Sequence, residues 1–449
     1  MRNIAELFPV KPRPGQVEAA ETLAGLLESG GAVVFTAPPG FGKTLTVLVA
    51  LKAGFLPAAW RVRALALARH IAEEAALLDL RSEVLPGREK VCPYALELGS
   101  DVHEWCRVRR DQCGYFTARS CPYFFHPSAD VYVFNYFRRA PPRIIDVWDE
   151  AHNLLVPREV CVNTEVFIEA AGELRSSGSN ELAKWLRSFL PFLERGEGEV
   201  PVDDNQVSSL HVAYLRLLER GGRRTALGRL YRVLRAQSVY VEGGYLCGAS
   251  VAIPRRRPAL FISATLPYPD LLGGKVVEVP WSRKYRAIIT EGLTTRFDEF
   301  GEKEVKEYGK LLWDLRKKYE KVLVFATERV AKSLSKFTDL YEPPEIPEWK
   351  GVLLLHTRGK FAEGVDIRAD VVVMAGAPFP PPWVTSRLRR TLSKMGFSGA
   401  DRIAEASMLS TTLQCVGRAT RRPEDDPLVI LADERYKRYE EELSKYFIF

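Results

Sequence analysis

The segment APPGFGKT, residues 37–44, combines residue types that bind the phosphates of a nucleotide. Gly40 and Gly42 let backbone N–H groups wrap phosphate oxygens, and Lys43 can reach the β and γ phosphates. The hydroxyl of Thr44 can bind the Mg²⁺ that accompanies ATP. An apolar run precedes the segment and helical spacing follows it, so a chance glycine loop is the weaker interpretation. We therefore predict a site for ATP and Mg²⁺ in this loop.

Two carboxylates end a second apolar run in IIDVWDEAHN, residues 144–153. Asp149 can hold Mg²⁺ through its hydration shell, and Glu150 can orient and deprotonate an attacking water. An exposed acidic strand end is the alternative, but this pair follows a phosphate loop by about a hundred residues. The pair therefore predicts ATP hydrolysis.

A third candidate segment is QCVGRATR, residues 414–421. It places Gln414, Arg418 and Arg421 at i, i+4 and i+7, so on a helix they would share one face. Arginines that point into a cleft can stabilise charge on a transferring γ phosphate. A solvated arginine face is the alternative interpretation.

Four of the seven cysteines lie within 30 positions of one another and form a candidate metal site. Clustered cysteines in an intracellular chain more often hold a metal than form disulfides. Their spacing has no C-x2-C pair, which structural zinc sites commonly use, whereas four dispersed thiolates can also bind a [4Fe–4S] cluster. His103 and His126 would favour zinc, and free thiols are the third interpretation. The clustered residues are Cys92, Cys106, Cys113 and Cys121, and the isolated ones are Cys161, Cys247 and Cys415.

The elements that must position these residues are short apolar runs bounded by turns, many of them separated by helical spacing. Continuous apolar runs are typical of buried parallel strands. We therefore expect an α/β fold with two parallel-sheet layers, one before and one after about residue 281. The predicted strands are 32–36, 63–68, 131–135, 144–148, 260–263, 322–325, 352–355, 371–375 and 428–431.

Two segments do not show this alternation of strands and helices, and we predict that they are insertions. Residues 86–125 hold the four cysteines and show no sustained period. Residues 164–237 predict two long helical stretches split by a loop at 196–204. Beyond them, Gly243 and Gly244 separate two β-type runs and predict a hairpin.

The composition is that of a folded chain of 449 residues with a net charge of +7. No apolar run is long enough to span a membrane, and Glu6 lies where a signal peptide would be apolar, so we expect a soluble, cytoplasmic protein. The chain has only six Asn and five Gln, and so low a number of heat-labile amide side chains indicates a thermophile. Six arginines and no acid at 220–235 form either a solvated face or one that tracks phosphates.

In their order along the chain, these segments resemble those of the XPD-like iron–sulfur DNA helicases of superfamily 2. The resemblance implies two RecA-like domains with ATP between them, and a [4Fe–4S] cluster on the four cysteines. It also implies that Arg13 and Gln16 contact adenine, and that Gly364 and Asp366 contact the nucleotide. The matching segments are RPGQ (13–16), APPGFGKT (37–44), the four-Cys insertion, ADVYVFNYF (129–137), DEAH (149–152), SATL (263–266), VLVFATE (322–328), TRGKFAEGVD (357–366), QCVGRATR (414–421) and LADERY (431–436).

The same resemblance sets the domain boundaries that we expect. The first RecA-like domain would comprise residues 1–85, 127–156 and 251–280, and the second would comprise 281–449. A cluster insertion would take 86–126, and a helical arch would take 157–250.

The function that the resemblance implies is an ATP-dependent DNA helicase or translocase that moves 5′ to 3′ on single-stranded DNA, in DNA repair. The cluster insertion would act as a wedge at junctions of single and double strands, and we expect a monomer that can meet repair proteins. One alternative is an ATP-gated DNA clamp with little unwinding. It is favoured by ALARH at 66–70, which lacks the family's hydroxyl residue before an arginine, and by the short second layer. Another alternative is a DNA-coupled redox sensor.

Overall fold

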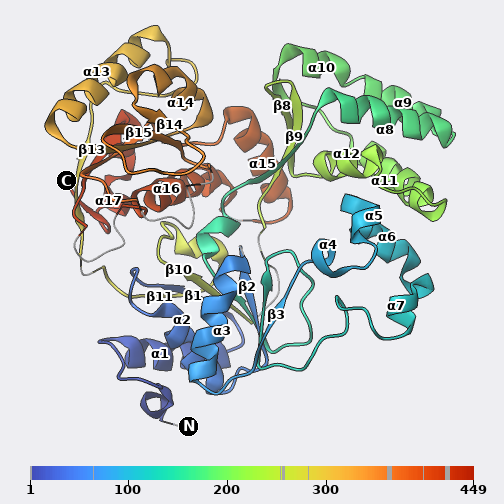
Figure 1. Ribbon diagram of the computed structural model, residues 1–449, viewed down its shortest axis with the longest axis horizontal. Helices are drawn as coiled ribbons and strands as arrows, with labels where there is room; N and C mark the ends of the chain where they lie inside the picture. The colour runs from blue at the N-terminus through green and yellow to red at the C-terminus, as the bar shows by residue number, and fades with distance from the viewer. Residues whose placement is uncertain are drawn as a thin grey trace. The chain divides into compact units, whose positions relative to one another are not determined.

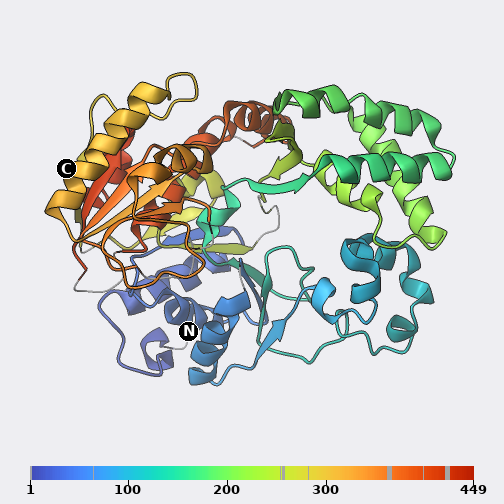
Figure 2. The same cartoon turned by 45° about the horizontal axis from the view of Figure 1, so that its top comes forward.

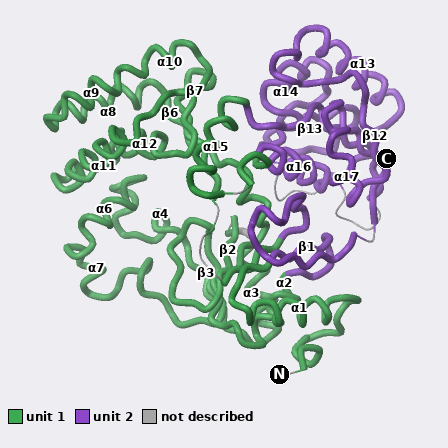
Figure 3. Tube along the Cα trace, turned by 180° about the vertical axis from the view of Figure 1, so that it is seen from behind, with its two compact units in different colours: residues 1–33, 44–262, 382–403 green, residues 34–43, 263–381, 404–449 purple. Residues whose placement is uncertain are grey.

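The computed structural model describes residues 3–63, 65–252, 254, 258–281, 283–359, 361, 367–397, 399–419 and 425–449. The chain divides into two compact units, which Figure 3 shows in different colours. Unit 1 contains residues 1–33, 44–262 and 382–403, and unit 2 contains residues 34–43, 263–381 and 404–449. In the described part of the chain, none of the helices is long and apolar enough to cross a membrane.

The first seven-stranded sheet has the strand order β11-β1-β10-β5-β2-β4-β3. β2 pairs in parallel with β4 and β5, and β5 pairs in parallel with β10. β1 and β10 are buried along their whole length, which is why they are continuous apolar runs in the sequence. The elements are α1 (Gln16–Glu28), β1 (Ala32–Thr36), α2 (Lys43–Lys52), β2 (Ala58–Val62), α3 (Ala68–Leu77), β3 (Ser82–Leu85), β4 (Val131–Asn135), β5 (Ile145–Trp148), β10 (Ala259–Ser263) and β11 (Lys275–Glu278).

The second seven-stranded sheet has the order β14-β15-β13-β16-β17-β12-β18, and each of its strand pairs is parallel. Helices α13 and α14 pack on one face of it, where Tyr308, Leu312 and Val330 join a core with Val324 and Leu354 of the sheet (Figure 1). The two parallel sheets confirm the predicted fold class. The elements are β12 (Tyr285–Ile289), α13 (Glu302–Lys318), β13 (Lys321–Ala326), α14 (Glu328–Leu334), β14 (Leu340–Tyr341), β15 (Gly351–His356), β16 (Val371–Ala375), α16 (Ile403–Val416), β17 (Leu428–Ala432), α17 (Glu440–Leu443) and β18 (Phe447–Ile448).

The predicted strands agree with the observed ones to within one residue at each end, with one exception. The strand predicted at 63–68 is wrong, because β2 ends at Val62 and residues 65–67 form a short 3₁₀ helix. β2 contains the buried Arg61, whose Nε lies 2.9 Å from a carboxylate oxygen of Asp146 on β5. A charged residue can lie inside a sheet when it is paired, and an apolar pattern cannot reveal that pairing.

The segment between β3 and β4 consists of short helical turns, in keeping with its lack of a sustained period. Buried Arg138, in the loop after β4, donates hydrogen bonds to the carbonyl oxygens of Pro86 at 3.0 Å and Tyr123 at 2.8 Å. One side chain thus fixes both ends of the segment. Its helices are α4 (Arg88–Val91), α5 (Ala95–Leu98), α6 (Val102–Arg109) and α7 (Gly114–Thr117).

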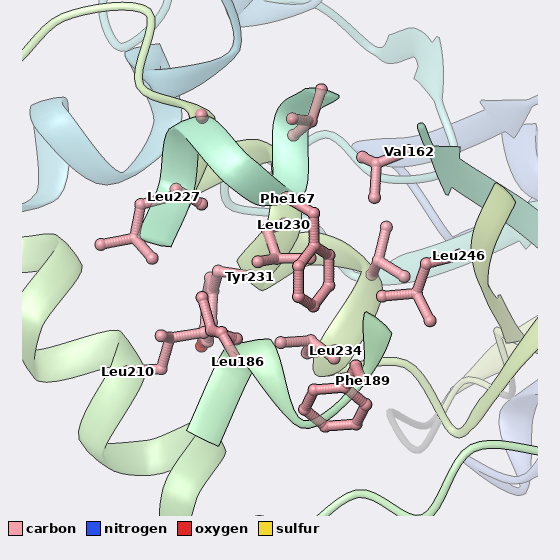
Figure 4. Close-up of a cluster of buried hydrophobic side chains, with 14 of the residues drawn as sticks. Val162, Phe167, Leu186, Phe189, Leu210, Leu227, Leu230, Tyr231, Leu234 and Leu246 are labelled. Carbon is pink, nitrogen blue, oxygen red and sulfur yellow. The ribbon is translucent and has the colours of Figure 1, made fainter. Parts of the chain in front are cut away.

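The segment between β5 and β10 contains helices α8 to α12 and an antiparallel sheet of order β6-β9-β8-β7. The helices bury a core of their own, in which Phe167, Leu186 and Leu230 meet (Figure 4). Gly243 and Gly244 have φ angles of 59° and 81°, as a two-residue turn of type I′ needs, so the predicted hairpin is confirmed. The elements are β6 (Arg158–Val162), α8 (Thr164–Ser176), α9 (Asn180–Arg187), α10 (Leu190–Arg195), β7 (Glu197–Glu199), α11 (Asp204–Glu219), α12 (Ala226–Leu234), β8 (Ser238–Glu242) and β9 (Tyr245–Ser250), with α15 (Pro382–Lys394) from later in the chain packed on the sheet.

A disulfide joins Cys161 on β6 to Cys247 on β9. The antiparallel register places the two residues directly opposite each other, although they are 86 positions apart in the sequence. Two cysteines that are isolated in the sequence are therefore neighbours in the fold. The bond closes the chain around helices α8 to α12, and closing so long a loop restricts the unfolded chain.

Asp101 connects the two segments within unit 1. It is fully buried before α6 and accepts hydrogen bonds from Tyr214 Oη at 2.9 Å and from the backbone N of Thr225 at 2.6 Å. A Cβ at Gly228 would lie only 2.3 Å from the Asp101 carboxylate, so this contact requires glycine there. Burial, and then the Asp101 charge, raise the pKa of Tyr214, which keeps its hydroxyl a donor. Figures 1 and 2 both show α5 and α6 beside α11 and α12.

Replacing Asp101 with alanine is expected to lower the free energy of unfolding by about 2–4 kcal/mol, because two buried donors lose their acceptor. Amide hydrogen exchange at the start of α12 should also become faster. Asp111→Ala, which removes an exposed carboxylate from the same segment, is the matched control and should change stability by less than about 0.5 kcal/mol. Equal effects of the two substitutions would contradict this role of Asp101.

Candidate functional site

The phosphate loop lies between β1 and α2, as its motif predicts. Gly40 and Gly42 have φ angles of 78° and 87°, in the left-handed region that favours glycine. The Nζ of Lys43 donates hydrogen bonds to the carbonyl oxygens of Ala37 at 3.1 Å and Pro38 at 3.3 Å. The lysine therefore folds back over its own loop, close to where the motif would bind phosphate oxygens.

Gln16 begins α1 and joins the RPGQ segment to the helix that follows the phosphate loop. It is only 3% exposed. Its Oε1 accepts a hydrogen bond from the backbone N of Arg13 at 2.7 Å, and its Nε2 donates to Thr46 Oγ1 on α2 at 3.2 Å. Thr44, the candidate Mg²⁺ ligand, lies in the first turn of the same helix. The contacts of Gln16 thus connect the two candidate nucleotide-binding segments.

The acid pair Asp149 and Glu150 follows β5 in a strained turn. Glu150 has a φ of 50° and a ψ of 49°, in the left-handed region that residues other than glycine rarely adopt. Its carbonyl oxygen accepts hydrogen bonds from Tyr136 Oη and from the backbone N of Asn153, both at 3.0 Å. Its Oε2 lies 3.3 Å from Nδ1 of the buried His152. Strain of this kind persists where the surroundings over-determine the backbone, and it clusters at functional sites.

Gln414 lies in the last turn of α16 and makes hydrogen bonds in both directions. Its Nε2 donates to Thr265 Oγ1 at 2.6 Å, and its Oε1 accepts from Arg418 Nη2 at 3.4 Å. The helix ends at Val416, before Gly417, so the prediction that Gln414 and Arg418 share a helical face is wrong. Glycine is a poor helix former, and the turn still lets the buried Arg418 reach Gln414. Arg421, Gly364 and Asp366 lie outside the described residues.

The four clustered cysteines line one small cavity. Burial raises the pKa values of the Cys92 and Cys106 thiols, and the other thiols nearby raise them further. Within the described ranges, no three His, Cys, Asp or Glu residues are close enough to hold a single metal ion. The cavity is lined by Cys92, Cys106, Cys113 and Cys121, with Arg88, Pro93, Trp105, Tyr115, Phe116, Tyr123 and Phe124 around them.

The two histidines that would favour zinc have other contacts. His103 Nε2 lies 3.4 Å from a carboxylate oxygen of Glu89, and burial lowers the pKa of His103. His126 Nδ1 lies 3.3 Å from the carbonyl oxygen of Pro127. Neither histidine is among the described residues that line the cavity.

Unit 1 also brings together arginines that the sequence interpretation did not combine. Arg63 follows β2, Arg158 lies on β6 and Arg232 on α12. Burial lowers the pKa of Arg158, and the positive charges of Arg63 and Arg232 lower it further, while the carboxylate of Glu89 raises it. The guanidinium of Arg158 also lies 4.4 Å from the ring centroid of the exposed Phe137. We call these four residues the basic group.

The arginine-rich stretch at 220–235 does not form a continuous basic face. Arg229 pairs with Glu169 at 2.8 Å, and Arg223 pairs with Glu97. Arg224 Nε donates to the carbonyl oxygen of Leu96 at 3.1 Å. Most of α12 is buried, because it forms part of the core between α8 and α11. Arg232 is the member of this stretch that joins the basic group.

Comparisons with known proteins agree with this fold. Residues 303–448 match the helicase C-terminal domain family. The structure of S. tokodaii Xpd4 matches with a TM-score of 0.65 and 18% identity, covering 97% of this chain and 100% of that one. An XPD helicase structure matches with a TM-score of 0.69 and 19% identity, covering 98% and 100%. The chain is XPD-like in fold. No curated protein sequence matches it.

The structure shows where the segment ALARH, residues 66–70, lies. The family's hydroxyl residue and arginine lie on the strand after the first helix, and in this chain that strand is β2. β2 ends at Val62 and is followed by Arg63, whereas residues 66–70 belong to the turn and the start of α3. ALARH therefore does not lie on this strand.

Proposed function

We propose that this XPD-like protein is an ATP-dependent DNA helicase or translocase. The observation that carries the proposal is the acid pair in the strained turn after β5, in a chain that has a helicase C-terminal domain. MgATP is the substrate, with its phosphates on the loop of Gly40, Gly42 and Lys43. By the family resemblance, Arg13 and Gln16 contact adenine, and Thr44, Gly364, Asp366, Gln414, Arg418 and Arg421 complete the nucleotide site.

The acid pair supplies the hydrolytic step. The Glu150 carboxylate takes a proton from the attacking water, whose oxygen bonds to the γ phosphorus as the bond to the ADP oxygen breaks. His152, 3.3 Å from Oε2, limits the positions that this carboxylate can adopt. Asp149 orients the hydrated Mg²⁺ of the substrate, and Lys43 balances charge on the phosphates.

Single-stranded DNA is the partner that the basic group fits. Burial lowers the pKa of Arg158, and the charges of Arg63 and Arg232, from two other parts of unit 1, lower it further, with Glu89 partly opposing them. Phosphates would relieve this repulsion, and the exposed Phe137 ring offers a surface on which a base can stack. The remaining parts of the proposal rest on the expectations from sequence and family. They are the direction of travel, the preference for junctions, a role in DNA repair, repair-protein partners, a monomeric state and a cytoplasmic location.

The four cysteines would hold a [4Fe–4S] cluster. Tetrahedral zinc at about 2.3 Å from each thiolate requires sulfurs about 3.8 Å apart. No such close group occurs among the described residues, whereas all four cysteines line one cavity, and four thiolates are the ligands that a [4Fe–4S] cluster uses. Binding would require deprotonated thiols and would stabilise a segment that has little regular structure.

Replacing Arg63, Arg158 and Arg232 together with glutamine tests the strand-binding part of this proposal. Binding of single-stranded DNA should weaken alike on every sequence, because phosphates carry no base identity. The slope of log affinity against log salt should flatten by about 0.7 per lost contact, or about 2 in total. Arg229→Gln is the matched control and should keep the slope, because Arg229 pairs with Glu169. An unchanged salt slope in the triple variant would contradict the proposal that single-stranded DNA binds to the basic group.

A further inference from the structure

Trp60 contacts the acid pair from inside the first sheet. It is fully buried on β2, opposite Val147 of β5. Its indole Nε1 donates a hydrogen bond to Asp149 Oδ2 at 3.2 Å. An indole has this single donor and no acceptor, so the ring presents one N–H to the carboxylate.

The other oxygen of Asp149 is held by the turn itself. Oδ1 accepts a hydrogen bond from the backbone N of Glu150 at 2.9 Å. Tyr136 Oη supports the same turn through the carbonyl oxygens of Asp149 and Glu150. The terminal torsion of an aspartate is intrinsically broad, so two donors from rigid elements determine the plane of its carboxylate.

A buried arginine anchors the Tyr136 side of this arrangement. Arg61 Nη1 donates to the carbonyl oxygens of Tyr136 at 2.9 Å and Arg138 at 3.1 Å, while Arg61 Nε binds Asp146. Trp60 and Arg61 are consecutive on β2, so one strand supports the acid pair directly and through the loop after β4. The donors are therefore fixed before any ligand binds.

We propose that Trp60 is a positioning residue of the nucleotide site, whose indole N–H fixes the Asp149 carboxylate in the orientation that receives hydrated Mg²⁺. This inference rests on the proposed function, in which Asp149 orients that ion. A carboxylate has about four lone-pair positions, so it can accept from Trp60 and Glu150 and still bind the water shell of a cation. The contribution of Trp60 is preorganisation, since a site held in place loses less freedom when the ligand binds.

Trp148 provides the contrast that makes the inference testable. It is a buried indole on β5, directly before Asp149. Its Nε1 has no hydrogen-bond partner among the described residues, although its ring lies against Arg61 and Tyr136. Trp60→Phe and Trp148→Phe thus remove similar volumes from one sheet, and only the first removes a hydrogen bond to Asp149.

The test is a Mg²⁺ titration of ATP hydrolysis in the parent protein and both variants. Trp60→Phe is expected to raise the half-saturating Mg²⁺ concentration about tenfold, the effect of losing a hydrogen bond to a charged group. At saturating Mg²⁺ its KM for ATP should stay within about twofold of the parent value. Trp148→Phe should keep the parent's Mg²⁺ dependence, while both variants lose some thermal stability from the smaller side chain.

Two further measurements separate positioning from a merely structural role. In an Asp149→Asn background, Trp60→Phe should change the Mg²⁺ dependence little further, because the two residues act through one contact. Mn²⁺ is a paramagnetic quencher of tryptophan fluorescence. Added with a non-hydrolysable ATP analogue, it should quench the parent and Trp148→Phe more than Trp60→Phe. A parent protein without Mg²⁺-dependent hydrolysis would overturn the proposed function and this role together. An active parent whose two tryptophan variants behave alike would overturn the role of Trp60 alone.

Discussion

Replacing Glu150 with glutamine is expected to slow ATP turnover by about 10²- to 10⁴-fold while ATP binding is retained. Glutamine keeps the size of the side chain and its place beside His152, whose Nδ1 lies 3.3 Å from Glu150 Oε2, but it cannot take a proton from water. The backbone contacts that hold the turn involve carbonyl oxygens, which this substitution leaves in place. Turnover should be measured with saturating single-stranded DNA, and binding by calorimetry with a non-hydrolysable analogue.

Two further variants serve as comparisons for Glu150→Gln. Lys43→Ala should weaken nucleotide binding itself, because it removes the cation of the phosphate loop. Glu159→Gln, at an exposed carboxylate on β6, should leave both quantities near the parent values. Near-normal DNA-stimulated turnover by Glu150→Gln would show that another group is the base.

Cys113→Ser is expected to remove the iron–sulfur cluster from the protein. Protein purified without oxygen should be brown and contain about four irons, and this variant should lose both the colour and the iron. Cys113 is buried in the cavity that all four thiols line. Loss of the cluster should loosen the segment between β3 and β4 and impair unwinding more than ATP hydrolysis.

Cys415→Ser is the matched control for metal content. Cys415 is buried in α16, and burial raises the pKa of its thiol to about 12. Its Sγ lies 3.6 Å from the carbonyl oxygen of Thr357, away from the other thiols in the sequence. This variant should keep its colour. Stoichiometric zinc without iron in native, unreconstituted protein would exclude the cluster.

The parts of the fold that sequence could predict are those in which local pattern and burial agree. β16 is apolar throughout and β4 is apolar up to Asn135; each has a neighbouring strand on both sides and coincides with its predicted range. The turn at Gly243 and Gly244 follows from backbone geometry that glycine alone adopts easily. In each of these elements, the residues that determine the structure are next to one another in the sequence.

The missed features depend on partners that are distant in the sequence. β2 was misplaced because its Arg61 is compensated by Asp146, 85 positions later. The disulfide of Cys161 depends on the register of β6 against β9. The end of α16 at Val416 is different, because Gly417, which follows it, stands in the sequence between Gln414 and Arg418.

The candidate site divides in the same way. Motif spacing predicts roles for Lys43, Asp149 and Glu150, because the chemistry of a phosphate loop and an acid pair leaves a local signature. Trp60 and Arg158 have no such signature. Trp60 matters because the fold places it against Asp149. Arg158 matters because the charges of Arg63 and Arg232 act on it.

The rate of ATP hydrolysis with and without single-stranded DNA, measured on cluster-intact protein, tests the central proposal most directly. A nucleic-acid motor couples its ATP cycle to the strand, so we expect single-stranded DNA to stimulate hydrolysis, and the basic-group triple variant to need more DNA for the same rate. An unwinding assay on the same preparation should show strand separation, whereas stimulated hydrolysis without it would favour the ATP-gated clamp. Hydrolysis that is unaffected by saturating single-stranded DNA would contradict the account.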